Sequence, residues 1–102
     1  MDHIAAKVQN GIKRLDAVGP ADWRDRINLD TLDVHSLSDC VLGQVFGDYG
    51  EGMDALFPGH RWLSDGINEE HGFEAPTDRL TGNRQYASVT AAWKIALTPV
   101  LV

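Results

Sequence analysis

Apolar residues recur at helical spacing along most of this chain. The first segment carries four of them, separated by four, four and three positions: Ile4, Val8, Ile12 and Leu15. This spacing places them on one face of a helix. Gly19-Pro20 follows, and that pair is a typical stop signal because proline cannot continue a helix. The pattern therefore predicts a first helix that ends at Val18, with Asp2 as its candidate N-cap.

The strongest helical signal lies in the middle of the chain. A broad apolar stripe occurs there: Val41, Leu42, Val45 and Phe46. Such a stripe is typical of a helix that is buried on most sides, so we expect these side chains, together with Trp93, to be nearly buried. Ser36 or Ser38 is the candidate N-cap and Gly47 the candidate C-cap. Gly43 indicates a close contact with another helix.

The remaining segments predict further short helices joined by irregular chain. Pro20 begins one or two helical turns, and helices are predicted over 48–57, 61–73 and 84–97. In residues 26–34 the alternation of apolar and polar positions slips in phase, and Asp and Asn are poor strand residues. We therefore expect a mainly α protein. It forms a single compact domain of four to six short helices, with an irregular or short-strand arm at 26–34.

Composition limits the setting of the protein. The chain has 102 residues, of which 43% are hydrophobic and 24% charged, as in one ordinary globular domain. Its single cysteine, Cys40, cannot form an intrachain disulfide, so a reducing cytosol is the natural compartment. Asp2 and His3 stand where a signal peptide would carry Lys or Arg. No segment reaches the roughly 18 apolar residues of a membrane helix. These features predict a cytoplasmic protein with no membrane partner.

The net charge of −6 is concentrated in the middle of the chain. Residues 27–60 contain no Lys or Arg and six acidic residues: Asp30, Asp33, Asp39, Asp48, Glu51 and Asp54. An acidic surface repels phosphate backbones, so we expect no binding to nucleic acid. A protein partner would be neutral or basic, although acidic loops also keep a small protein soluble when no partner exists.

Within this segment, Asp48, Glu51 and Asp54 are three positions apart, which is the spacing of one helix face. We therefore take them as candidate partner-binding residues. The glycines between them do not form a nucleotide loop, because the Lys and Ser or Thr of such a loop are missing. A Ca²⁺ loop is also excluded, since its oxygen ligands follow a regular alternation over about twelve residues.

The residues most able to ligate zinc are far apart in sequence: His35, Cys40, His60 and His71. Zinc sites usually bring ligands in pairs about two to five residues apart. Cys40 near a helix start is a candidate nucleophile, but the neighbouring Asp39 opposes the thiolate and a buried thiol is commoner. A group of charges beside His71 is typical of a solvated helix face rather than an acid–base cluster: Asp65, Glu69 and Glu70. We predict no catalytic, cofactor or metal site.

The central block from Asp39 to Gly52, DCVLGQVFGDYGEG, resembles a block in a family of small proteins from actinobacteria and the phages that infect them (mycobacteriophage-like proteins). In that family an arm similar to residues 27–34 precedes the block. A pair similar to Gly72-Phe73 and a helix with a pair similar to Ala92-Trp93 follow it. The resemblance covers about residues 22–95. It implies a bacterial or infected-host cytoplasm, and it implies no functional residue.

The whole chain, residues 1–102, is expected to form the one domain, with the helix of residues 1–19 outside the family-like core of 22–95. The stripe that begins with Ile4 and Val8, and the apolar tail that contains Leu101, lie outside that core. A chain of this size has limited room to bury both, and leftover apolar patches usually mark contacts between chains. The sequence therefore favours a homodimer through these residues, with packing of the tail on the first helix as the alternative.

The expected function is that of a small cytoplasmic accessory protein, not an enzyme, that acts through contacts with a protein partner or with itself. Two other classes stay open. One is a small enzyme or metal protein that uses Cys40 and histidines, and the other is a structural component of an oligomer or particle.

Overall fold

The computed structural model describes residues 3–59 and 66–98. The helices in these residues are α1 (Ile4–Val18), the 3-10 turn η1 (Trp23–Arg26), α2 (Val41–Phe46), α3 (Tyr49–Leu56), α4 (Ile67–Glu70) and α5 (Tyr86–Leu97). In the described ranges there is no strand, and one isolated antiparallel bridge joins Thr77 to Arg84. The expected fold of four to six short helices is therefore confirmed. The arm that follows η1 is irregular.

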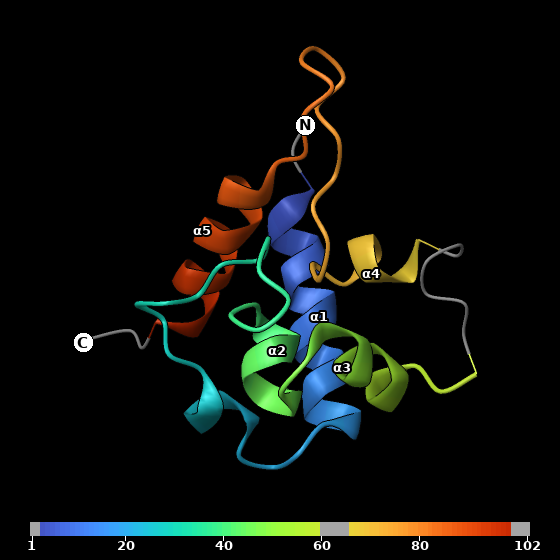
Figure 1. Ribbon diagram of the computed structural model, residues 1–102, viewed down its shortest axis with the longest axis vertical. Coiled ribbons are helices and arrows are strands. Elements are labelled where there is room, and N and C mark those ends of the chain that lie inside the picture. Colours follow the sequence, from blue (N-terminus) through green and yellow to red (C-terminus); the bar gives the residue numbers. More distant parts are fainter. Residues whose placement is uncertain (1–2, 60–65, 99–102) are drawn as a thin grey trace.

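Helix α1 runs through the middle of the molecule (Figure 1). It contacts α3, α4 and α5, while α2 packs against α3 and η1. All four apolar residues of the α1 stripe are buried in the same core as α2, α3 and α5: Ile4, Val8, Ile12 and Leu15. The chain therefore covers this stripe by itself. The physical reason is that α1 lies between α3, α4 and α5, and these helices cover different parts of its apolar stripe. The apolar tail, the other part of the expectation from chain size, lies outside the described residues, so the homodimer stays a prediction.

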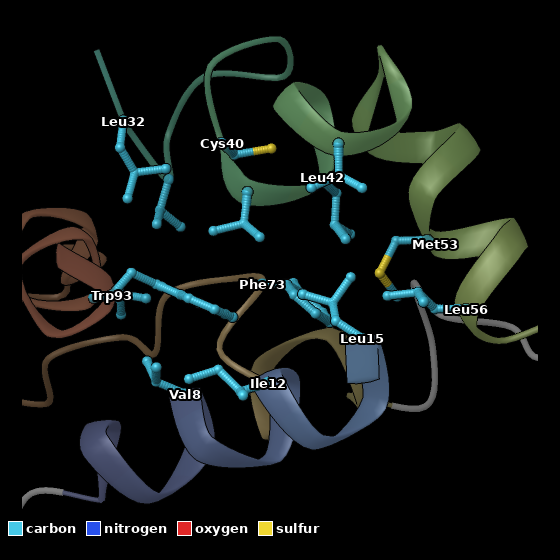
Figure 2. Close-up of a cluster of buried hydrophobic side chains, with 14 of the residues drawn as sticks. Val8, Ile12, Leu15, Leu32, Cys40, Leu42, Met53, Leu56, Phe73 and Trp93 are labelled. Carbon is cyan, nitrogen blue, oxygen red and sulfur yellow. The ribbon is translucent and has the colours of Figure 1, made fainter. Parts of the chain in front are cut away.

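Trp93 of α5 packs against α1 in the core. Figure 2 shows its side chain reaching from α5 toward the centre, near Val8 and Ile12 of α1. Its ring stacks against Phe73 with centroids 5.7 Å apart, and it is fully buried as the sequence predicted. The approach of α1 requires Gly11, because a Cβ there would overlap the carbonyl oxygen of His71 and lie 3.0 Å from the Trp93 ring.

The central helix begins later than its sequence pattern indicated. Its N-cap is Cys40, whose sulfur accepts a hydrogen bond from the Gly43 N–H at 3.3 Å. The hydroxyl of Ser36 instead accepts from the N–H groups of Ser38 and Asp39, in the turn before the helix. Serine favours such local turns as much as caps, so the expected serine N-cap is wrong.

The predicted C-cap of α2 is confirmed, and the predicted burial of its apolar side chains is confirmed in part. Gly47 has φ 94°, the left-handed conformation of a C-cap. Val41, Leu42 and Val45 are buried, but Phe46 is only partly buried. Phe46 lies at the edge of the stripe, about 140° around the helix axis from Val41, and at the last position of α2, so the core covers it only in part.

The other elements follow the predicted order. Helix α3 confirms the prediction for 48–57, and α5 confirms that for 84–97. The helix predicted over 61–73 is represented by α4 in the described chain, and residues 60–65 lie outside the description. Gly72 follows the end of α4 with φ 71°, in the left-handed region. The N-cap of α1 is His3, without a side-chain hydrogen bond, and the expected cap Asp2 lies outside the described residues.

Candidate partner-binding site

The carboxylates of the acidic segment all lie on the surface. The exposed acidic residues between positions 27 and 59 are Asp30, Asp33, Asp39, Asp48, Glu51 and Asp54, and we call this set the acidic surface. They come from the arm, the loop before α2, and α3. Because that stretch contains no Lys or Arg, the surface has no positive side chain of its own.

A hydrogen-bonded loop holds Leu37 at the surface, and Asp33 and Asp39 flank it along the chain. The N–H of Asp33 donates to the carbonyl oxygen of Asp39 at 3.1 Å, which closes the loop. The carbonyl oxygen of Leu37 accepts from the N–H of Tyr49 at 3.1 Å, which ties the loop to the start of α3. The Leu37 side chain is 65% exposed. A leucine is thus held at the surface by backbone contacts and not by burial of its own side chain.

The close approach of this loop to α2 depends on Gly43. A Cβ at Gly43 would lie 2.5 Å from the carbonyl oxygens of Leu37 and Ser38, closer than real side chains come. Gly43 therefore does mark a close contact, but with the loop and not with another helix as expected. The Gln44 side chain adds a second tie, since its Nε2 donates to Asp39 O at 2.8 Å and to Asn28 O at 3.2 Å. These contacts restrict where Leu37 can lie.

The three carboxylates predicted to bind a partner have different positions on α3. Asp48 is the N-cap, and its Oδ2 accepts from the Glu51 N–H at 3.2 Å. Asp48 therefore stabilises the helix as well as adding charge. Glu51 and Asp54 are exposed within the helix. Asp48 also precedes Tyr49, so it lies beside the Leu37 loop. We define the Leu37 patch as Leu37 with Asp33, Asp39 and Asp48.

The apolar residues predicted to bind a partner have different outcomes. Ile4 and Val8 are buried in the chain's own core, so neither side chain offers a surface in the protomer. Leu101, in the predicted apolar tail, lies outside the described residues. The large apolar side chains that the described residues expose lie elsewhere: Val18, Leu37, Leu80 and Ile95.

Two arginines from outside the acidic segment support its helices. Arg26 Nη1 donates to Val45 O at 3.0 Å, near the end of α2. Arg14 Nε donates to Leu56 O at 2.8 Å, at the end of α3. Positive groups are favourable at helix C-termini, where carbonyl groups lack partners within the helix. These two cations thus satisfy backbone groups and support the elements that carry the acidic surface.

Buried and partly buried polar groups next to the patch have hydrogen-bond partners within the chain. Asn68 of α4 donates to the Tyr49 hydroxyl at 3.0 Å. Burial raises the pKa of Tyr49 to about 12, so the phenol stays neutral at physiological pH. Burial also raises the pKa of the Cys40 thiol, which lowers its thiolate fraction and its reactivity. Neither group has the properties of an activated nucleophile or base.

Two of the histidines weighed as zinc ligands, His35 and His71, make aromatic and hydrogen-bond contacts of their own. His35 stacks on Tyr86 with ring centroids 4.2 Å apart. The Nδ1 atom of His71 lies 2.8 Å from Ile67 O, and its ring packs edge-on against Phe57. Nowhere in residues 3–59 and 66–98 do three or more His, Cys, Asp or Glu side chains gather where they could hold a metal ion.

Two residues of the zinc and acid–base sets, His60 and Asp65, lie outside the described residues. Glu69 of the acid–base set lies 4.0 Å from the Arg84 guanidinium, and Glu70 is exposed. The described parts of this set therefore agree with a solvated helix face.

Sequence reasoning missed Leu37 as a surface residue. Its signal was present, because Leu37 is a single apolar residue between Ser36 and Ser38, with Asp39 next. We expected a helix N-terminus there, and an apolar residue at that point would pack inward. The turn formed by Ser36 delays the helix and leaves Leu37 outside.

Comparison with known proteins does not assign the chain to a family. No family model, curated protein or solved structure matches it. Of the helices that the structure describes, none combines the length and the apolar character needed to cross a membrane.

Proposed function

We propose that the protein is a small accessory protein that acts by binding a protein partner through the Leu37 patch. The observation that carries this proposal is a leucine that is 65% exposed, in a loop whose backbone hydrogen bonds join Asp33 to Asp39 and Leu37 to Tyr49. An apolar side chain surrounded by polar groups is the usual anatomy of a binding contact, in which the apolar centre loses its water and the rim stays solvated.

Charge indicates the chemistry of the partner. The patch belongs to a segment with six carboxylates and no Lys or Arg, so the complementary surface carries an apolar pocket with Lys or Arg at its edge. Complementary charge raises the rate of association and selects against acidic partners, nucleic acid among them. The resemblance of the central block supports an actinobacterial or phage setting in the cytoplasm, as part of the same proposal.

The test begins with affinity purification from actinobacterial extract, using the tagged protein and two variants. Leu37→Ser removes the apolar centre of the patch. Leu80→Ser is the matched control, because Leu80 is 96% exposed in the turn near residues 78–83, away from the patch. We expect one basic protein to be enriched with the parent and with Leu80→Ser, and to be lost with Leu37→Ser.

The purified partner then allows calorimetry. Leu37→Ser is expected to raise the Kd about tenfold or more, as for a central interface residue, and added salt is expected to weaken binding. Equal binding by all three proteins would overturn the proposal. So would tight binding of duplex DNA at physiological salt, because the acidic surface opposes it.

A further inference from the structure

The chain between α4 and α5 forms a narrow hairpin, residues 77–84, that projects beyond the helices (orange in Figure 1). The first and last of these residues form the isolated antiparallel bridge. Next to the bridge, the Gln85 N–H donates to Pro76 O at 2.9 Å. Leu80, near the tip of the hairpin, is 96% exposed. The hairpin is therefore closed at its base and extends into solvent at its tip.

The hydrogen bonds of the tip join its own residues to one another. The Asp78 N–H donates to Asn83 O at 2.7 Å, and Asp78 O accepts from the Gly82 N–H at 2.8 Å. Asp78 Oδ1 accepts from the Leu80 N–H at 2.8 Å. Residues 79–84 are exposed, so opening of the tip uncovers no core side chain, and water can replace each of these hydrogen bonds. Segments with these properties open locally at a low cost in free energy.

Arg79 differs from the other cations that the structure describes. Only Arg79 and Arg84 among them lie outside the helices and η1. Arg84 is held at the base of the hairpin, because its Nη1 donates to Ala75 O at 2.8 Å. The structure shows no hydrogen bond or ion pair between the Arg79 side chain and another described residue. An arginine and the peptide bond that follows it are thus both accessible from solvent.

We propose that the Arg79–Leu80 peptide bond is a processing site for an endopeptidase that cleaves after arginine. Such an enzyme binds the guanidinium in an acidic pocket, and the exposed Leu80 fits an apolar pocket beside it. Hydrolysis breaks the C–N bond and adds one water, which leaves a carboxylate on Arg79 and an ammonium group on Leu80. Both charges form in solvent, so neither has to be buried. The inference goes beyond the partner-binding function and does not rest on it.

The cut chain keeps its fold, because both sides of the cut are anchored in one core. Before the hairpin, Phe73 is buried and stacks on Trp93 with ring centroids 5.7 Å apart. After the hairpin, α5 contributes Val89 and Trp93, which are fully buried. Separation of the fragments 1–79 and 80–102 would expose these apolar side chains to water, which is unfavourable. The product is therefore a two-chain protein with the fold of the parent.

Digestion of the folded protein with trypsin, followed by mass spectrometry, tests the site. All proteins in the test carry Arg61→Gln, because Arg61 lies outside the described residues and its cleavage would divide the first fragment. We expect fragment 80–102 to form at least about tenfold faster than products of cleavage after Arg84 or Lys13, because those bonds need a larger opening of the structure. Faster cleavage after Arg84 or Lys13 would overturn the proposal.

Two variants separate the position of the bond from the identity of its residue. Arg79→Gln is expected to abolish fragment 80–102 with an unchanged helical circular dichroism signal. Addition of Leu80→Lys to that variant moves the cleavable bond by one residue, at a side chain that is 96% exposed. We expect trypsin to cut the double variant after position 80 at a rate similar to that of the parent. A double variant that resists cleavage would overturn the accessibility of the hairpin tip.

Size-exclusion chromatography of the cut protein tests the two-chain product. Fragments 1–79 and 80–102 are expected to elute together in native buffer, with the helical circular dichroism signal retained, and to separate in urea. Separation of the fragments in native buffer, or loss of the helical signal on cleavage, would overturn the inference that the processed protein keeps its fold.

Discussion

The indole N–H of Trp93 donates a hydrogen bond to the carbonyl oxygen of Gly72 across 2.6 Å in the buried interior. This bond ties α5 to the turn that follows α4. The same turn lies against α1, because a Cβ at Gly72 would be only 3.0 Å from Val8 Cα. Three segments from the beginning, middle and end of the described chain therefore meet around one tryptophan.

Replacing Trp93 by Phe should lower the free energy of unfolding by about 2–4 kcal/mol, because it leaves a cavity and removes the donor to a buried carbonyl. Urea unfolding measures the change. Trp23→Phe is the matched control, since Trp23 is also buried but donates to Asp16, whose carboxylate is half exposed and can bind water instead. An equal decrease in the free energy of unfolding in the two variants would show that the hydrogen bond to Gly72 adds no stability beyond that of the Trp23 bond.

Gly11→Ala should destabilise the protein even though alanine favours helix by about 1 kcal/mol over glycine. The added Cβ would overlap the His71 carbonyl oxygen and press on Trp93, and overpacking of this kind costs about 1–3 kcal/mol. Thermal unfolding shows directly whether Gly11→Ala raises or lowers the Tm. Ala6→Gly, at an exposed position of the same helix, gives the propensity effect alone. A higher Tm for Gly11→Ala would contradict the close packing of α1 on the turn.

Leu42→Ala should cost more stability than Phe46→Ala, although phenylalanine is the larger side chain. Leu42 is fully buried in the core, whereas Phe46 is only partly buried at the end of α2. A fully buried leucine costs about 2–5 kcal/mol when truncated, and we expect the cost of Phe46→Ala to lie below that of Leu42→Ala. Chemical denaturation of both variants decides the order, and the reverse order would place Phe46 in the core after all.

The Cys40 thiol should react slowly with a thiol reagent at neutral pH in the folded protein. Burial raises its pKa, so the thiolate is scarcer than in an exposed cysteine, and the side chain is covered. The rate should rise to that of a free cysteine in denaturant, which serves as the internal control. Fast labelling of the native protein would instead support the alternative in which Cys40 is a reactive group.

Local signals in the sequence explain which elements were predicted well. The stripe from Ile4 to Leu15 and the stop at Gly19 depend only on helical geometry and on backbone conformation, so α1 was found with nearly its observed bounds. The start of α2 was missed for a physical reason. Ser36 can cap a helix or close a turn with similar ease. The turn is selected by two tertiary contacts of the Leu37 loop: its close packing on Gly43 and its hydrogen bond from the Tyr49 N–H.

The sequence by itself therefore determined a mainly helical chain, the periodic faces of its longer helices, and an acidic middle segment without cations. Only the tertiary structure decided which apolar faces are covered. Packing of α1 among α3, α4 and α5 buries Ile4 and Val8, which the pattern alone could not distinguish from a surface stripe. The same packing leaves Leu37 and Ile95 exposed. Burial of a side chain depends on which segments from distant parts of the chain pack against it, and the periodicity of the sequence does not identify those segments.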